Sequence, residues 1–207
     1  MTMVRRVASL CRRRHFAKRI VCGRPKAVSR NPLGMLYLRA LIFTILVPGF
    51  VAGWAPWMLL ASGHEVRAFD AGPWRWAGLA AIVAGAAGYL LCAADFVLKG
   101  GGTPAIWFTR PLRFLLGEEP RAIVQQGLYR YSRNPMYLSV AAVVFGEGWF
   151  FGSALLLLYG VAVFIFFHLI VVLVEEPHLR RKGGPSYIEY CRRTPRWIGK
   201  SHGSAMR

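Results

Sequence analysis

The long apolar stretch at residues 135–174 limits what this chain can fold into more than any other feature. It contains no Lys or Arg and is interrupted only by GEGWFFGS at 146–153. One α-helix over that length would measure about 60 Å, twice the roughly 30 Å hydrocarbon core of a bilayer. We therefore predict a hairpin of two membrane-spanning helices, residues 135–151 and 153–174, with its turn near Phe151–Ser153.

Two further stretches upstream are also long enough to cross a bilayer. Residues 36–61 contain Pro48 and Pro56, which predict kinks. Residues 74–98 contain the small residues Gly85–Gly88, which favour close contact with another helix. The chain is therefore expected to be an all-α integral membrane protein with about four transmembrane helices.

Charge sets the expected orientation of these helices. The chain is 55% hydrophobic yet has a formal net charge of +18, which suits a membrane protein with basic flanks better than a soluble domain. Lys and Arg are abundant in residues 1–39, 99–134 and 175–207, whereas the short loop 62–73 holds only Arg67. Because basic segments stay on the cytosolic side, both termini and the long loop are predicted to be cytosolic. The basic charge is assigned to the membrane flanks, so no nucleic-acid partner is expected.

Residues 1–34 contain ten Lys or Arg and no acidic residue. Such a segment predicts a disordered basic arm at the cytosolic membrane face. Its composition also resembles an organellar transit peptide. A start at Met35 is a further alternative, because MLYLRALIFT is a suitable opening for a membrane helix. The remaining residues, 35–207, form the predicted membrane domain, with a cytosolic tail at 175–207.

The cysteines give no sign of a disulfide framework or a metal site. They are scattered and form no CxxC pair. Their positions are Cys11, Cys22, Cys92 and Cys191. Reduced thiols and no metal are therefore expected.

The start of the predicted third helix carries a group of polar residues. Asn134 is a favoured helix N-cap and Pro135 is favoured at the first helical position, so the helix is expected to begin here. The free N–H groups and the dipole of that first turn attract anions, and Arg130 and Arg133 add positive charge. The same residues, with the nearby tyrosines, are also typical of ordinary anchoring at the headgroup level.

The end of the predicted fourth helix carries two acids. Glu175 and Glu176 precede Pro177, which is expected to stop the helix. Two acids at a helix C-terminus oppose the helix dipole, so we expect them to face a cation or hydroxyl donors. The antiparallel hairpin would bring them beside the start of the third helix. There, an ion pair with Arg130 or Arg133 is the structural alternative.

His168 is the one ionisable residue placed deep in the predicted fourth helix. It lies seven residues before Glu175, about 10 Å deeper and on the same helix face. A histidine inside a span is either a functional group or a packing residue hydrogen-bonded to another helix. Glu147, near the far end of the third helix, is interpreted as structural.

The tail continues with a short amphipathic pattern. Tyr187, Ile188 and Tyr190 predict one helical segment, followed by arginines and Trp197. This segment suits either a membrane-surface anchor or a lid over the polar ends of the hairpin. One cytosol-facing pocket is therefore predicted, suited to a mixed-charge ligand that is used on a lipid-soluble substrate.

Two motifs resemble those of the integral-membrane methyltransferases. They are GLYRYSRNPMYL at 127–138 and EEPHLRRKGGPSYIEYCRRTPRWI at 175–198. That superfamily includes the isoprenylcysteine carboxyl methyltransferases and the phospholipid N-methyltransferases. The resemblance is close over 127–198, and GGTPAIW at 101–107 is similar to bacterial members. It implies a location in the inner (plasma) membrane of a bacterium.

The resemblance implies S-adenosylmethionine as the methyl donor and a lipid or lipidated acceptor. Candidates for cofactor binding are Arg130, Arg133, Asn134, Pro135, Tyr137, Glu175, Glu176, Tyr187 and Tyr190, and catalytic candidates are Glu175, His168 and Arg193. Many relatives have His where this chain has Asn134, so contact there need not use a titratable ring. An isoprenylcysteine carboxylate would need no base. A phospholipid amine must lose a proton, for which Glu175, His168 or a tyrosine is a candidate.

A non-catalytic membrane scaffold or small transporter is the alternative. A transporter would need ionisable groups near the midplane on several spans, whereas only His168 is deep here. A membrane haem protein is disfavoured because only one histidine lies within a span. The motifs do not choose between methyl acceptors, and they do not predict an oligomeric state.

Overall fold

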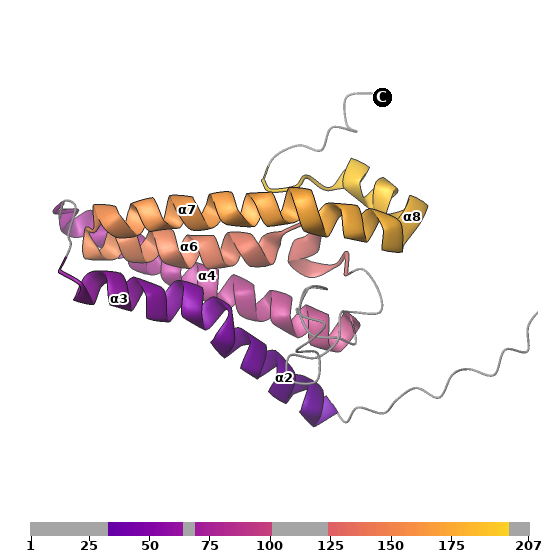
Figure 1. Cartoon of the computed structure of the whole chain (residues 1–207), viewed down its shortest axis with the longest axis horizontal. Coiled ribbons are helices and arrows are strands. Elements are labelled where there is room, and N and C mark those ends of the chain that lie inside the picture. The colour runs from indigo at the N-terminus through magenta and orange to yellow at the C-terminus, as the bar shows by residue number, and fades with distance from the viewer. Residues whose placement is uncertain (1–32, 64–68, 101–123, 199–207) are drawn as a thin grey trace, which may run out of the picture. The chain divides into compact units, whose positions relative to one another are not determined.

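The computed structural model describes residues 33–63, 69–100 and 124–198 (Figure 1). These residues form helices and turns and no β-strand, which confirms the all-α prediction for this part of the chain. The predicted basic arm lies outside them except for its last two residues, which already belong to the first described helix. Most of the predicted loop at 99–134 also lies outside the described residues.

The first predicted span is one helical course with an irregular middle. Helix α2, Leu33–Leu46, is followed by a π-helical turn, η1, Phe50–Trp54, and by α3, Ala55–Ala61. Figure 1 shows the bend between α2 and α3. The irregular part lies between Pro48 and Pro56 and agrees with the predicted kinks, because proline has no N–H to donate to the preceding helical turn.

Helix α4, Arg75–Asp95, packs against α6, Pro135–Phe151, so closely that the two backbones are in contact. A Cβ atom at Gly78 would lie 2.6 Å from the carbonyl oxygen of Gly146, and one at Gly85 would lie equally close to another α6 carbonyl. These positions have no room for a side chain, so the close helix contact predicted around Gly85 is confirmed. Short turns flank the two helices: η2, Gly72–Trp74, before α4, η3, Phe96–Gly100, after it, and η5, Gly127–Arg130, before α6.

Helices α6 and α7, Ala154–Ile170, form the predicted hairpin. Its turn is at Gly152, whose φ of 66° lies in the left-handed region that glycine adopts at the lowest cost. The Ser153 hydroxyl caps α7 by accepting the Leu156 N–H at 3.3 Å. The predicted position of the turn is therefore confirmed.

The second arm of the hairpin does not stop at Pro177, which corrects the sequence prediction. Helix α7 continues through a π-helical turn, η6, Val171–Glu175, into α8, Glu176–Arg193 (Figure 1). The backbone N–H that follows η6 bonds to the Val171 carbonyl, five residues back. This wider turn makes room for the proline ring. It also tolerates the loss of the backbone hydrogen bond that proline cannot donate.

The π-helical turn also changes which residues share a helix face. In a regular α-helix, the seven-residue spacing would place His168 and Glu175 on one face. The extra residue of η6 rotates everything after it by roughly 100° relative to α7. Glu175 is the last residue of η6, so the predicted shared face with His168 stays a prediction, and the two side chains have different partners.

Helix α8 bends at Gly184, whose φ of 54° and ψ of −137° are not helical. The segment after the bend is helical, as predicted for the tail. Tyr187 and Tyr190 are buried, whereas Ile188 is 49% exposed. The two tyrosines therefore form the buried face of this helical segment, and Ile188 lies on its exposed face.

Three of the described helices are long and apolar enough to cross a membrane: Gly34–Ala61, Gly72–Gly100 and Ala154–Arg193. Helix α6, with 17 residues, is apolar but lies at the short end of the spanning range. Large apolar side chains along these helices, such as Leu90, are more than half exposed, as expected for lipid-facing positions. The helix that ends at Arg193 has 40 residues, so its polar α8 part lies beyond the apolar span.

Candidate functional site

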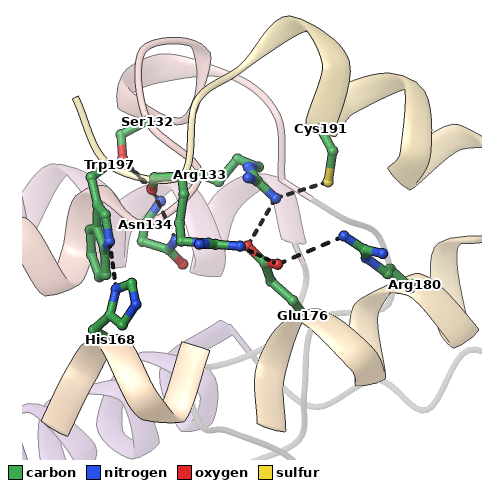
Figure 2. Close-up of polar contacts among 9 residues, drawn as sticks. Ser132, Arg133, Asn134, His168, Glu176, Arg180, Cys191 and Trp197 are labelled. Carbon is green, nitrogen blue, oxygen red and sulfur yellow. Dashed lines mark hydrogen bonds and ion pairs between the residues drawn. The ribbon is translucent and has the colours of Figure 1, made fainter. Parts of the chain in front are cut away.

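A buried carboxylate joins the two polar ends of the hairpin. Glu176, the first residue of α8, is 5% exposed. Its Oε1 accepts hydrogen bonds from Arg133 Nη1 at 3.0 Å and from Arg196 Nε at 2.7 Å. Its Oε2 accepts one from Arg196 Nη2 at 3.0 Å, and Arg180 Nη2 lies 3.9 Å from it (Figure 2). These three arginines form what we call the arginine cluster.

The arginine cluster carries more positive charge than this one carboxylate neutralises. Burial by itself raises the pKa of Glu176. The hydrogen bond from Arg196 and the charges of Arg133, Arg196 and Arg180 outweigh burial and hold that pKa below its usual range. Glu176 is therefore ionised at neutral pH, and the cluster keeps a surplus of positive charge.

Arg133 has donors that Glu176 does not use. Its Nη1 also contacts Cys191 Sγ at 3.0 Å, whereas its Nε is buried with no hydrogen-bond partner among the described residues. Only 11% of the Arg133 side chain is exposed, so bulk water does not serve this N–H. A buried, unpaired donor on a charged group is costly and suits an anionic ligand.

The first turn of α6 keeps its backbone donors. Asn134 stands at the predicted N-cap position and Pro135 follows it, but the Asn134 side chain makes no cap. Its Nδ2 instead donates to the Arg196 carbonyl at 3.0 Å, and the Ser132 hydroxyl donates to the same carbonyl at 3.2 Å. The side chain therefore fixes a returning segment of chain, and the helix N-terminus retains its attraction for anions.

The returning segment is residues 194–198, which we call the C-terminal strap. It follows α8 and crosses the start of α6, where the Arg133 N–H donates to the Pro195 carbonyl at 2.9 Å. Near its end, Trp197 Nε1 donates to His168 Nδ1 at 3.1 Å, which connects the strap to α7 (Figure 2). The strap thus contacts both helices of the hairpin.

The second acid of the pair accepts a hydrogen bond from a tyrosine. The Tyr137 hydroxyl donates to Glu175 Oε2 at 3.0 Å, and the Tyr137 ring packs 4.9 Å from that of Phe167. A second tyrosine hydroxyl connects α8 to the segment before α6: the Tyr190 hydroxyl donates to the Tyr129 carbonyl at 2.7 Å. Burial raises the pKa values of Tyr129 and Tyr190, so both hydroxyls stay protonated at neutral pH. The two adjacent acids therefore have chemically different surroundings.

The structure brings together most of the residues that the sequence singled out. Those in or beside the site are Arg133, Asn134, Pro135, Tyr137, His168, Glu175, Glu176, Tyr187 and Tyr190. Two others lie apart. Arg130 is exposed, and Arg193 is 75% exposed and pairs with Glu189 at 2.8 Å. Neither contacts the arginine cluster within the described part of the chain.

Four residues of the site were not anticipated from the sequence: Ser132, Arg180, Cys191 and Arg196. A usable signal for Arg196 was the string TPRW at 194–197. A residue before proline is disfavoured in helical conformation, so a Thr-Pro pair favours the end of a helix. The arginine after such a pair lies on returning chain, where it can reach a buried acid, rather than on the exposed helix surface that carries Arg193.

The fold and the site define an integral membrane protein with a buried, charged site at one end of an apolar helical hairpin. Residues 83–184 match the family model described as phospholipid methyltransferase. The match runs from α4 to the bend in α8, about half of the chain. It confirms the resemblance to the integral-membrane methyltransferases over this part of the chain. Comparisons with curated proteins and with solved structures gave no significant match.

Proposed function

We propose that this chain transfers a methyl group from S-adenosylmethionine to a lipophilic acceptor at the cytosolic face of a bacterial inner membrane. The observation that carries the proposal is the Arg133–Glu176 ion pair at 3.0 Å, which joins the two motif halves into one site. That pairing leaves the Arg133 Nε–H buried and unpaired beside the first turn of α6. The match to a methyltransferase family supports the same reading.

The residues present fit the charges of S-adenosylmethionine. Its carboxylate suits the Arg133 Nε–H and the N-terminus of α6. Its amino group and ribose hydroxyls are hydrogen-bond donors that suit the carboxylate of Glu175. When bound, this cofactor supplies a methyl group on a positively charged sulfur, which takes up an electron pair as the methyl group leaves. The part of the protein is to hold and orient both reactants, which can supply much of the rate.

The two acceptor classes make different demands on the site. An isoprenylcysteine carboxylate is already a nucleophile, whereas a phospholipid amine must first lose a proton. Glu175 is better suited to take that proton than His168. The Tyr137 hydroxyl orients the Glu175 carboxylate, while the Nδ1 of His168 already accepts the indole N–H of Trp197. Both acceptor classes remain within the proposal.

Calorimetric titration of S-adenosylmethionine into the purified protein tests the proposal. Arg133→Lys keeps a positive charge beside Glu176 but removes the Nε–H, and Glu175→Gln removes the second acid. Because hydrogen bonds to charged groups contribute about 1.5–3 kcal/mol, each change is expected to weaken binding by roughly tenfold or more. Arg192→Ala is the matched control. That side chain is 71% exposed and lies 3.7 Å from Glu189, so wild-type affinity is expected.

The alternative function gives a different result. Folded wild-type protein that shows no saturable binding in detergent or in lipid bilayers would contradict the proposal and favour a scaffold or transport role. If binding is found, transfer of a radiolabelled methyl group to extracted phospholipids or to a prenylcysteine analogue would separate the two acceptor classes.

A further inference from the structure

A hydrogen bond connects the end of the C-terminal strap to the last turn of α7. Trp197 Nε1 lies 3.1 Å from His168 Nδ1 (Figure 2). An indole N–H can only donate, so Nδ1 must be unprotonated and must accept. The neutral ring then carries its proton on Nε2. His168 is therefore committed to holding Trp197 rather than available at Nδ1 to accept a proton.

The surroundings of this contact are apolar. The Trp197 ring lies 5.1 Å from that of Phe164 and 6.1 Å from that of His168, tilted 30° to the latter. Trp197 also packs against a buried cluster that includes Phe167 and Tyr89. A polar N–H in such a place is costly without its acceptor, so the bond favours one position of the indole over others that would pack equally well.

The position of Trp197 determines that of its neighbour in the strap. Arg196 precedes it directly, and its guanidinium donates two hydrogen bonds to the carboxylate of Glu176. The Arg196 carbonyl in turn accepts from Ser132 and Asn134 at the start of α6. The strap is thus attached on one side to α7, through Trp197, and on the other to α6 and α8.

We infer that His168 and Trp197 form a latch, a positioning pair that holds Arg196 against Glu176 and so keeps the site in its binding-competent arrangement. As far as it concerns cofactor affinity, this inference rests on the proposed function. It assigns His168 a role different from that of a catalytic base. The specific element is the N–H···N hydrogen bond and not only the packing of two rings.

The first test measures the strap directly and needs no cofactor. The Arg133 amide donates to the Pro195 carbonyl, so hydrogen exchange at this amide reports whether the strap lies against the start of α6. His168→Leu and Trp197→Phe remove the acceptor and the donor, and each is expected to speed this exchange about fivefold or more. His168→Asn places a side-chain carbonyl oxygen near the position of Nδ1 and should retain wild-type protection. Trp57→Phe, at a 62% exposed tryptophan, is the control.

Two outcomes would overturn the latch. One is unchanged Arg133 exchange in both His168→Leu and Trp197→Phe. The other is an Asn variant that behaves like the Leu variant, because packing alone would then account for the effect. The double variant should exchange no faster than the faster single variant, since both remove the same bond.

The second test measures S-adenosylmethionine affinity by calorimetry on the same variants. His168→Leu and Trp197→Phe are expected to weaken binding about five- to tenfold, and His168→Asn to restore it. Equal affinity in all variants, with tight wild-type binding, would refute the latch and leave the proposed function standing. Absence of wild-type binding would refute the proposed function, while the exchange measurement would still decide whether the latch holds the strap.

Discussion

Removing the charge of Glu176 should destabilise the protein far more than removing that of an exposed acid. The substitution Glu176→Gln keeps the side-chain volume but leaves Arg133 and Arg196 without their buried anion. Breaking a buried ion pair by removing one partner costs about 3–5 kcal/mol. Arg196 is 34% exposed and Arg180 is 61% exposed, so water will partly compensate both, and we expect a loss of about 2–4 kcal/mol.

The matched control is Glu189→Gln. Glu189 is 47% exposed and pairs with Arg192 and Arg193, which are both more than two-thirds exposed. Surface ion pairs of this kind contribute about 0–1 kcal/mol. Reversible unfolding of both variants in mixed detergent micelles, followed by circular dichroism, measures the difference. A Glu176 variant that loses no more stability than the Glu189 variant would show that the arginine cluster is solvated rather than buried.

Two further predictions concern acid unfolding and helix packing. The pKa of Glu176 is lower in the folded protein than in the unfolded chain, so its stabilising effect is fully present above the unfolded value and is lost as pH falls through the folded one. Acid titrations of unfolding should therefore be flatter for Glu176→Gln than for wild type. Gly78→Ala places a Cβ 2.6 Å from a facing backbone carbonyl and should cost about 1–3 kcal/mol in the same unfolding assay. Gly53→Ala, where nothing lies within 4 Å, should be nearly neutral, and equal losses at both positions would contradict the close helix contact.

The apolar pattern was sufficient to predict the hairpin, because its length is a physical limit. A stretch twice as long as a bilayer is thick must turn, and the Gly152–Ser153 pair supplies a turn and a cap. The small residues of α4 were equally informative, since glycines allow two backbones to touch. These features depend on local composition, which the sequence states directly.

The parts that the sequence did not predict depend on contacts between distant segments. Pro177 was expected to end a helix, but a π-helical turn accommodates it, and no local rule distinguishes the two results. The Asn134 side chain was expected to cap α6, yet it bonds to a strap more than sixty residues away. Helical periodicity also gave no guidance on Arg196, because the strap after Thr194 is not helical.

The order in which the chain is synthesised determines when the C-terminal strap can join the site. A chain is made from its N-terminus, so α4, α6 and α7 leave the ribosome before Arg196 and Trp197 do. Arg133 and Arg180 are therefore synthesised before Arg196, so Glu176 gains its bidentate partner last. Both helices of the hairpin are thus synthesised while the charged site is still incomplete. The C-terminal strap can therefore complete the hydrogen bonds of Glu176 only after both helices of the hairpin have been synthesised.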